Sequence, residues 1–561
     1  MILDRLAELR GRLSDDDVPA EGYKDQPVRW VLDLAPDGRI TGLSPTEGTS
    51  KKGKAMSTPY ARRTSGISAF LLVDKPAYVL GLDDDGAPSE KAGARHDAYL
   101  ALLDEAARET GDDRLARLAG ALRDDAQLAF ARDRLTEHKW ATGDLIAPRL
   151  DGVFLHRAPS ARRFWSARQS ETDDGGGLVS ECLVCGKEKP IATKHPIEIR
   201  VGPNPAPLIS MNKPAFRSHG LGQSENAPMC YDCARTYGEA LRFLLGSDAH
   251  HLYVSGAEWL FWTREPAPAF DPVTLFKEPT PDAVALLRAP FHGHEPSGDA
   301  DNRFYALVVT GAWKRLVVRS WLDRPLAEVR AALAGYFQRQ AVADRDGTVR
   351  PQKLLALAGA TVRELGDLPP QTVPALLEHA LTGRRLPSAL LLQALRRAPA
   401  DRDPSGNATP VTRARAALIR LVLSSTHPDL MTDSVLTPDH PDPAYHCGRL
   451  LAVLDGIQSA DVNASLVDRF YGSASTTPAA VFGTLVKKAQ PHLAKLRKTR
   501  RGLYHYFEQQ ISEITMRIPG FPTTLTPEQQ GLFALGYYQQ KNRPTTSDAG
   551  PADAEPAPTD A

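Results

Sequence analysis

The chain has 561 residues, a length at which two or three separate hydrophobic cores are expected rather than one. Hydrophobic residues make up 42% of it and charged residues 24%, values typical of globular proteins, which exclude a fibrous or wholly disordered chain. Lys and Arg together number 68, as do Asp and Glu, so a nucleic-acid-binding surface would have to be local rather than a property of the net charge.

Targeting signals are not apparent in the sequence. Residues 1–10 interleave charged and apolar side chains and lack the uninterrupted apolar stretch of a signal peptide. No run of about 18 apolar residues, the length that spans a bilayer, follows. We therefore expect a cytoplasmic protein without a membrane segment.

The first half of the chain mixes strand and helix patterns. Short β-rich runs separated by turns, such as residues 28–32 and 70–73, predict a small sheet within residues 1–90. Residues 91–150 carry apolar side chains three and four positions apart, which predicts amphipathic helices on the outside of a domain. Residues 171–177 then predict a loop.

Strand character returns at residues 252–263 and 304–322, where two apolar runs flank Gly311 and predict a hairpin. After about residue 325 the pattern is helical almost throughout. One helix face is marked by residues at helical spacing, Cys447, Leu450, Leu451, Leu454 and Ile457. The second half should therefore be a helical bundle.

Four of the five cysteines form two Cys-x-x-Cys pairs, Cys182 with Cys185 and Cys230 with Cys233, separated by 44 residues. In a long chain without a secretion signal, this pattern favours metal binding over disulfides. Four thiolates fill the tetrahedral coordination sphere of zinc, whereas catalytic zinc keeps one position open for water. We therefore predict a structural zinc ion that staples an inserted region, and we expect Cys447 to be a small buried residue of a helix.

Two histidines inside this insertion, His195 and His219, are alternative metal ligands. For both, an ordinary hydrogen-bonding role is favoured over ligation. The sequence contains no phosphate-binding Gly-Lys-Ser/Thr loop, no His-Glu-x-x-His motif and no nucleophile elbow. We expect a protein that is not itself an enzyme.

The C-terminal half contains a basic segment. Between Asp468 and Glu508 there is no carboxylate, and Tyr504, Tyr506 and Phe507 lie at its end. The segment predicts a groove for phosphates and stacked bases, with a merely solvated helix face as the alternative. Its eight cations are Arg469, Lys487, Lys488, Lys495, Arg497, Lys498, Arg500 and Arg501.

Two further basic windows lie in the N-terminal half. The first, between Gly48 and Val73, predicts a basic loop that could reach a DNA groove, or equally a flexible surface excursion, and contains Lys51, Lys52, Lys54, Arg62 and Arg63. The second is weaker and surrounds Phe164 and Trp165 with Arg157, Arg162, Arg163 and Arg168.

Together these patterns predict an α+β fold, with a mixed α/β N-terminal half that carries the zinc-stapled insertion, followed by a C-terminal α-helical bundle. In chain order we expect a mixed α/β region with the basic loop, the zinc insertion, a β-rich remainder, a helical region, the C-terminal bundle and a disordered tail, at residues 1–175, 176–250, 251–325, 326–430, 431–540 and 541–561.

Several non-periodic strings go beyond what fold patterns require. The strongest are residues 442–455, 463–478 and 528–540, and others are 215–220 with 226–228, 319–322, 412–420, 63–67 and 78–81. Through these strings the chain resembles the type I-C CRISPR-associated large-subunit family, also called the Csd-one or Cas-eight-c family. Many members of that family lack the complete cysteine quartet, especially the pair matching Cys230 and Cys233.

The resemblance implies a non-catalytic subunit of Cascade, the guide-RNA complex. Such a subunit inspects the short PAM beside a target, helps to open the double-stranded DNA, and presents it to a separate helicase-nuclease that cleaves it. This division of labour is physically reasonable because guide pairing reads the sequence while protein reads only a short duplex motif. The N-terminal basic window would then contact the PAM-side duplex, and the C-terminal basic segment would carry the non-target strand.

The resemblance also implies that the C-terminal helical part is similar to a separate small subunit, which can be made from an internal start. Met431 is the candidate start, giving a product of residues 431–561. Two other functions stay open on the residues alone: a zinc-stapled nucleic-acid-binding or regulatory protein acting outside CRISPR, and a metal-dependent nuclease or hydrolase.

Overall fold

The structure is a computed structural model, and it divides the chain into two compact units. The first comprises Met1–Phe243 with Gly311–Leu316, and the second comprises Leu244–Thr310 with Val317–Ala561. The residues described are 2–543 without 15–16, 19–21, 47–52, 62–65, 84–85, 174–177, 194, 196, 198, 202–204, 207, 210–212, 289–300, 313–314, 402–409, 431 and 463.

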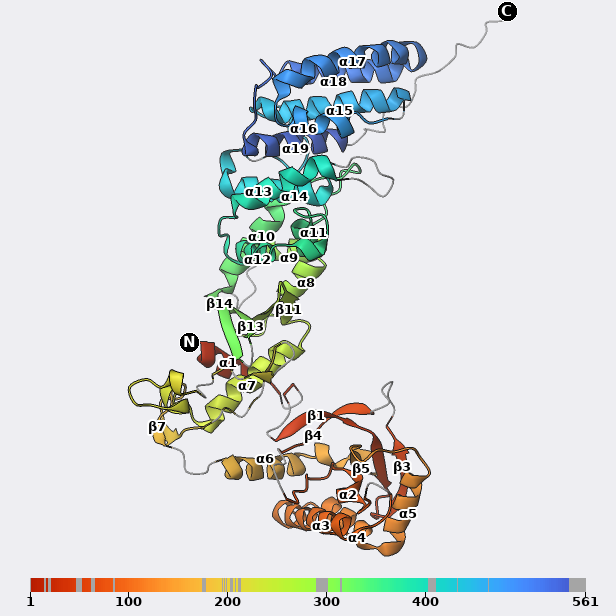
Figure 1. Cartoon of the computed structure of the whole chain (residues 1–561), viewed down its shortest axis with the longest axis vertical. Helices are drawn as coiled ribbons and strands as arrows, with labels where there is room; N and C mark the ends of the chain where they lie inside the picture. The colour runs from red at the N-terminus through yellow and green to blue at the C-terminus, as the bar shows by residue number, and fades with distance from the viewer. Residues whose placement is uncertain are drawn as a thin grey trace, which may run out of the picture. The chain divides into compact units, whose positions relative to one another are not determined.

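The first unit contains a small mixed sheet (Figure 1). Its strand order is β3-β2-β5-β6, in which β2 pairs with β3 antiparallel and with β5 parallel. A separate antiparallel ribbon joins β1 to β4. The strands are β1 (Tyr23–Val28), β2 (Trp30–Leu34), β3 (Ile40–Pro45), β4 (Lys54–Pro59), β5 (Ile146–Leu150) and β6 (Val153–Phe154). Sheet structure within residues 1–90 is thus confirmed.

Helices of the first unit begin at residues that cap their free N–H groups. The Ser89 side chain accepts a hydrogen bond from the Ala92 amide, and Asp112 and Asp124 cap the next two helices in the same way. The predicted helices within residues 91–150 are confirmed. The helices are α1 (Ile2–Arg12), α2 (Pro76–Val79), α3 (Glu90–Thr110), α4 (Asp113–Arg123), α5 (Asp125–Thr136) and α6 (Pro159–Asp173).

Two local predictions for this unit are wrong. Residues 70–73 are not a strand but an irregular buried segment, because Leu72 has φ +66°, outside the β region, and the Phe70 amide donates to the Asp74 carboxylate instead of to a neighbouring strand. The loop expected at 171–177 begins later, since α6 continues to Asp173, and residues 174–177 lie outside the described part.

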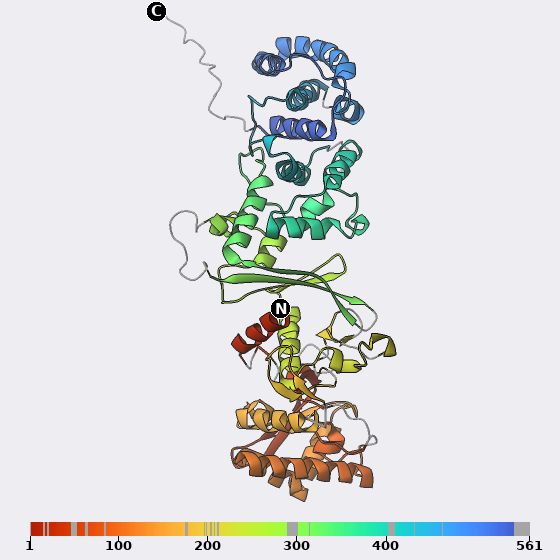
Figure 2. The same ribbon diagram turned by 90° about the vertical axis from the view of Figure 1, so that its left-hand side faces the viewer.

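The second unit combines a four-stranded sheet with helices. The order β11-β12-β13-β14 confirms the hairpin expected around Gly311. Figure 2 shows this sheet nearly edge-on, with the helices that follow it stacked on one side. Phe261 and Phe304 from the sheet share one hydrophobic core with the helices. The strands are β11 (His251–Val254), β12 (Ala257–Thr263), β13 (Arg303–Ala312) and β14 (Arg315–Pro325).

Helices account for nearly all regular structure after β14, as predicted, and Figure 1 shows them in successive layers. Two helices precede β13, namely α8 (Pro272–Lys277) and α9 (Pro281–Arg288). The first group after β14 is α10 (Leu326–Arg339), α11 (Leu354–Gly359), α12 (Thr372–Thr382), α13 (Ser388–Arg397) and α14 (Arg413–Thr426). The C-terminal bundle follows with α15 (Pro443–Val462), α16 (Val467–Ala474), α17 (Pro478–Thr499), α18 (Arg501–Thr515) and α19 (Pro527–Lys541).

Two glycines allow α15 and α19 to approach backbone to backbone. A Cβ on Gly448 would lie 1.9 Å from the carbonyl oxygen of Phe533, and a Cβ on Gly536 would lie 2.0 Å from that of Tyr445. The predicted apolar face of α15 is buried beside this contact, and Cys447 is a buried residue in it as expected. The tail beyond residue 543 lies outside the described residues.

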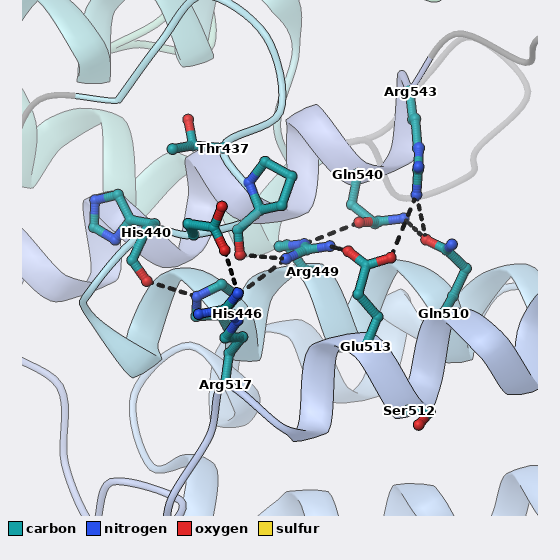
Figure 3. A network of polar contacts seen from close by, with 12 residues as sticks. Thr437, His440, His446, Arg449, Gln510, Ser512, Glu513, Arg517, Gln540 and Arg543 are labelled. Carbon is teal, nitrogen blue, oxygen red and sulfur yellow. Dashed lines mark hydrogen bonds and ion pairs between the residues drawn. The ribbon is translucent and has the colours of Figure 1, made fainter.

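A buried polar network closes one end of the bundle (Figure 3). Arg449 is fully buried on α15, and its guanidinium donates to the Glu513 carboxylate at 2.6 Å and to the Gln540 side chain at 3.0 Å. His446 accepts from Arg449 through Nδ1 and lies 2.7 Å from the His440 carbonyl oxygen through Nε2. The network therefore holds α15, α18 and α19 together around a neutral imidazole.

Adding one methyl group at the helix contact tests its tightness. Gly536→Ala should lower the stability of the bundle by about 1–3 kcal/mol, because the helices must separate to admit the Cβ. The matched control is Gly483→Ala on α17, where no atom lies within 4 Å and the change should stabilise the helix by about 0.5–1 kcal/mol. Chemical denaturation of both variants measures the difference, and equal midpoints would contradict the close packing.

The network also predicts a pH dependence. Burial lowers the pKa of His446 below its ordinary value of 6.5, so the unfolded chain binds this proton more readily than the folded chain does. The contribution of His446 to stability is therefore complete above about pH 6.5 and is lost as the pH falls below it. His446→Gln should reduce the stability lost on acidification to about pH 5, measured by denaturant midpoints relative to the parent chain; an unchanged loss would show that His446 does not titrate on unfolding.

Candidate metal centre and nucleic-acid interface

The first cysteine pair lies in a tight turn between two short strands. Cys182 and Cys185 fall between β7 (Val179–Glu181) and β8 (Glu188–Pro190), which pair antiparallel. The Gly186 amide donates to the Cys182 carbonyl oxygen at 2.9 Å, and Gly186 has φ +64°, a conformation that glycine adopts without strain. The turn directs both thiols to one side, as a metal knuckle requires.

The second pair opens a helix. Cys230 immediately precedes α7 (Tyr231–Gly246), and Cys233 lies in its first turn. Backbone hydrogen bonds tie this helix start to the first pair: the Leu183 amide donates to the Pro228 carbonyl oxygen at 2.9 Å, and a β-bridge joins Ile191 to Cys230. The chain between the two pairs is thereby closed into a loop.

The four Sγ atoms lie within 4.8 Å of one another, so Cys182, Cys185, Cys230 and Cys233 can together hold a metal ion. Burial tends to raise the pKa of the Cys182 thiol, but backbone N–H groups outweigh it and lower that pKa to about 6. Burial and the neighbouring thiols raise the pKa values of Cys230 and Cys233. Without a cation the cluster therefore resists full ionisation, and a divalent metal would supply the missing charge.

The two spare histidines do not join the cluster. His195 lies 2.5 Å from the Tyr237 hydroxyl, and burial lowers its pKa to about 4. His219 is exposed, with φ +50°. Among the described residues the metal-binding group consists of the four cysteines alone. This is a closed donor set, which suits a structural role better than a catalytic one.

Seven of the eight C-terminal basic residues lie along α17 and at the start of α18, and all eight are exposed. Lys487, Lys488, Lys495 and Lys498 share one face of α17, because positions seven and eleven apart are close to whole numbers of helical turns. We call these four residues the lysine face. Arg497 lies off this face, and Arg500 and Arg501 follow at the junction with α18, whereas Arg469 belongs to α16.

Spatial neighbours modify this surface in ways that the local sequence does not show. Asp461 on α15 lies 2.6 Å from the Lys495 ammonium group, so the acid-free segment is not acid-free in space. Phe507 is buried in the bundle core against Gly456, and its predicted role in base stacking is therefore wrong. Tyr506, which is 44% exposed, stays available for stacking.

The N-terminal basic window is described only in part. Lys54 begins β4 and is exposed, opposite Val28 in the ribbon. Lys51, Lys52, Arg62 and Arg63 lie outside the described residues.

The weaker third window has a structural explanation. The Trp165 indole donates to the Gly22 carbonyl oxygen at 2.7 Å and, with Phe164, is buried in the core. Arg168 pairs with Glu105. Neither aromatic ring is exposed for base stacking.

Sequence reasoning missed two kinds of residue. The first is Asp461, whose approach to the lysine face depends on the packing of α15 against α17. The second is a set of buried arginines within the strings that suggested the family: Arg415 pairs with Asp401, and Arg420 donates to the Thr432 carbonyl oxygen at 3.0 Å. No sequence signal distinguishes them from exposed cations, and only burial shows that they stabilise the fold.

Comparison with known proteins identifies the class and the family. The family described as CRISPR-associated protein (Cas_Csd1) matches residues 5–544, nearly the whole chain, so this is a CRISPR-associated protein. The chain belongs to the Csd1 family, as its resemblance to the type I-C family predicted. No curated protein matches the sequence. Within the described part of the chain, no helix is both long and apolar enough to cross a membrane.

Removing one thiol tests the metal centre. Cys233→Ser should lower the bound metal from about one equivalent to near zero and expose residues 178–230 to protease, because a structural metal contributes on the order of 10 kcal/mol to local folding. Cys447→Ala, which removes a thiol outside the cluster, should retain the metal. Elemental analysis with limited proteolysis reports both, and a Cys233→Ser protein that keeps its metal would contradict the assignment.

Proposed function

We propose that this protein is the large subunit of a type I-C Cascade, which recognises the PAM, helps to open target DNA and holds it for a recruited helicase-nuclease. The observation that carries the proposal is the family match over residues 5–544. It acts in the cytoplasm with guide RNA and the other Cascade subunits. It has no catalytic role of its own, since cleavage is assigned to the recruited nuclease.

The lysine face supports a role in holding DNA. Lys487 and Lys498 are eleven positions apart, so they span about 16 Å along α17. Phosphates of one strand in duplex DNA follow each other at about 3.4 Å along the axis, so the face covers roughly five phosphates. Tyr506 adds an exposed aromatic ring on the next helix, which can stack on a base of the displaced non-target strand. Lys54 and the neighbouring basic residues of the N-terminal window would contact the PAM-side duplex.

For the metal centre we propose zinc, which prefers four thiolates in tetrahedral geometry. A closed sphere of four thiolates leaves no position for a water nucleophile, which supports a structural role rather than a nuclease reaction. The metal would staple the chain from the β7–β8 turn to α7. Its loss should therefore affect folding of this segment first and DNA binding only indirectly.

The C-terminal bundle could also be made separately as a small subunit. Helices α15 to α19 supply nearly all of one hydrophobic cluster, which also includes Ala398, and this supports an independently folding product. Met431, the candidate start, lies outside the described residues. In the full chain α19 also packs on the preceding helices, where Gly531 lies against Leu423 and Ile419. A separate product would expose this apolar face to another subunit.

Coexpression tests the proposed function. The chain would be produced with its genomic neighbours and a guide array, purified, and tested for binding to target duplex with randomised flanking bases. Entry into a guide-RNA particle that selects a short flank supports the large-subunit role. A chain that stays alone and binds DNA without a guide would instead be a zinc-stapled DNA-binding protein acting outside CRISPR.

Charge reversal on the lysine face should weaken binding of target duplex by the assembled complex. The double variant Lys487→Glu and Lys498→Glu removes two phosphate contacts, so the slope of log affinity against log salt should become shallower by about two, and the affinity should fall about tenfold or more at low salt. The control reverses Arg350 and Lys353, two exposed cations that already face carboxylates. Identical salt slopes for the two double variants would rule out the lysine face as a DNA contact.

A further inference from the structure

One carboxylate intrudes on the lysine face. Asp461 lies in the last turn of α15, with Oδ1 2.6 Å from Lys495 Nζ and Oδ2 2.7 Å from His492 Nδ1. The Asp461 side chain is 8% exposed, whereas that of Lys495 is 60% exposed. Hydrogen bonds from His492 and Lys495 hold the pKa of the Asp461 carboxyl below its ordinary value, so it is ionised near neutral pH.

The end of α15 also engages a second cation. Arg500 Nη1 lies 3.4 Å from the Ala460 carbonyl oxygen, one of the last carbonyl groups of the helix. Cations at this end of a helix are favoured because the unpaired carbonyl groups carry partial negative charge. Lys495 and Arg500 thus serve the contact between α15 and the α17–α18 pair.

Other cations of the basic segment differ from Lys495 and Arg500 in their contacts. Lys487, Arg497 and Lys498 form no ion pair with any described residue, and Lys488 lies 4.9 Å from the centre of the Phe470 ring. The basic segment therefore divides into cations that anchor α15 and cations that stay available to an anionic ligand. The division follows the position of Asp461 rather than the sequence.

We propose that Asp461 acts as an electrostatic brake, by which we mean that its carboxylate weakens DNA binding. The carboxylate competes with DNA phosphate for Lys495 and repels the DNA backbone along the lysine face. The proposal rests on the proposed function and assigns a regulatory residue to the same surface. A phosphate approaching Lys495 comes within a few ångströms of this carboxylate, well inside the Debye length of about 8 Å at physiological salt. Only Lys487, Lys488 and Lys498 of the lysine face are therefore fully available to DNA phosphate, although the face contains four lysines.

The test is Asp461→Asn in the assembled guide complex. Removing the charge frees Lys495 for one more phosphate contact, so affinity for target duplex should rise about threefold to tenfold near 0.1 M salt, and the salt slope should steepen by about one. The matched control is Asp439→Asn, which removes an exposed carboxylate paired with Arg517 just beyond the far end of α18. Arg517, the partner of Asp439, lies about 24 Å along the helix axis from Arg501, so the control variant should leave binding unchanged.

Two lysine variants distinguish an effect of the Asp461 charge on DNA binding from an effect of Asp461→Asn on folding. Lys495→Gln should change affinity less than Lys498→Gln, although both lysines are exposed on the same helix face. In the Asp461→Asn background, Lys495→Gln should abolish the gain in affinity. Because Lys495→Gln and Lys498→Gln leave Asp461 intact, the comparison of these two variants stays valid even where Asp461→Asn destabilises the bundle.

The outcomes distinguish the two proposals. If reversing Lys487 and Lys498 weakens binding while Asp461→Asn leaves it unchanged or weaker and Lys495→Gln equals Lys498→Gln, the brake is overturned and the large-subunit role stands. If the parent chain neither enters a guide complex nor binds target duplex, the proposed function itself falls.

Discussion

The backbone contact between α15 and α19 determines the geometry of the C-terminal bundle. Gly448 and Gly536 let each helix place a carbonyl group where a side chain would otherwise stand. Close approach fixes the helix axes, and the buried Arg449 network then ties α18 to the same pair. Because α15 is held in this way, its last turn is placed against α17, and Asp461 meets the lysine face. The charge pattern of the surface is thus a consequence of packing in the core.

The positions of the four cysteine thiols likewise depend on the backbone structure around them. The thiols are brought together by a β-turn, a helix start and the hydrogen bonds between them. A bound cation would remove the repulsion between the thiolates, so metal binding would be coupled to local folding. The cysteine cluster belongs to the first unit and the lysine face to the second. The first groups four thiols that can hold a metal ion, and the second groups positive charge at an exposed surface.

Much of this could be predicted from the sequence, and the failures share one physical reason. The cysteine quartet, the hairpin around Gly311 and the apolar face of α15 depend on spacing along the chain, which the sequence displays. The buried segment at 70–73 has the composition of a strand, but Leu72 takes a positive φ and the Asp74 carboxylate accepts a hydrogen bond from the Phe70 amide. The availability of Lys495 and Phe507 depends on helices that pack from elsewhere in the chain. Side chains brought together by tertiary packing leave no mark in a local window.

On the proposed function, the C-terminal bundle of this Csd1-family protein contacts target DNA within a guide complex. Photo-crosslinking of target DNA to the assembled complex, followed by peptide mapping, tests this contact. Crosslinks are expected on peptides from α17 and the start of α18, including residues 487–506, and none on the cysteine turn at residues 182–186. A complex that binds its target yet yields no crosslink within residues 478–515 would contradict the proposed contact.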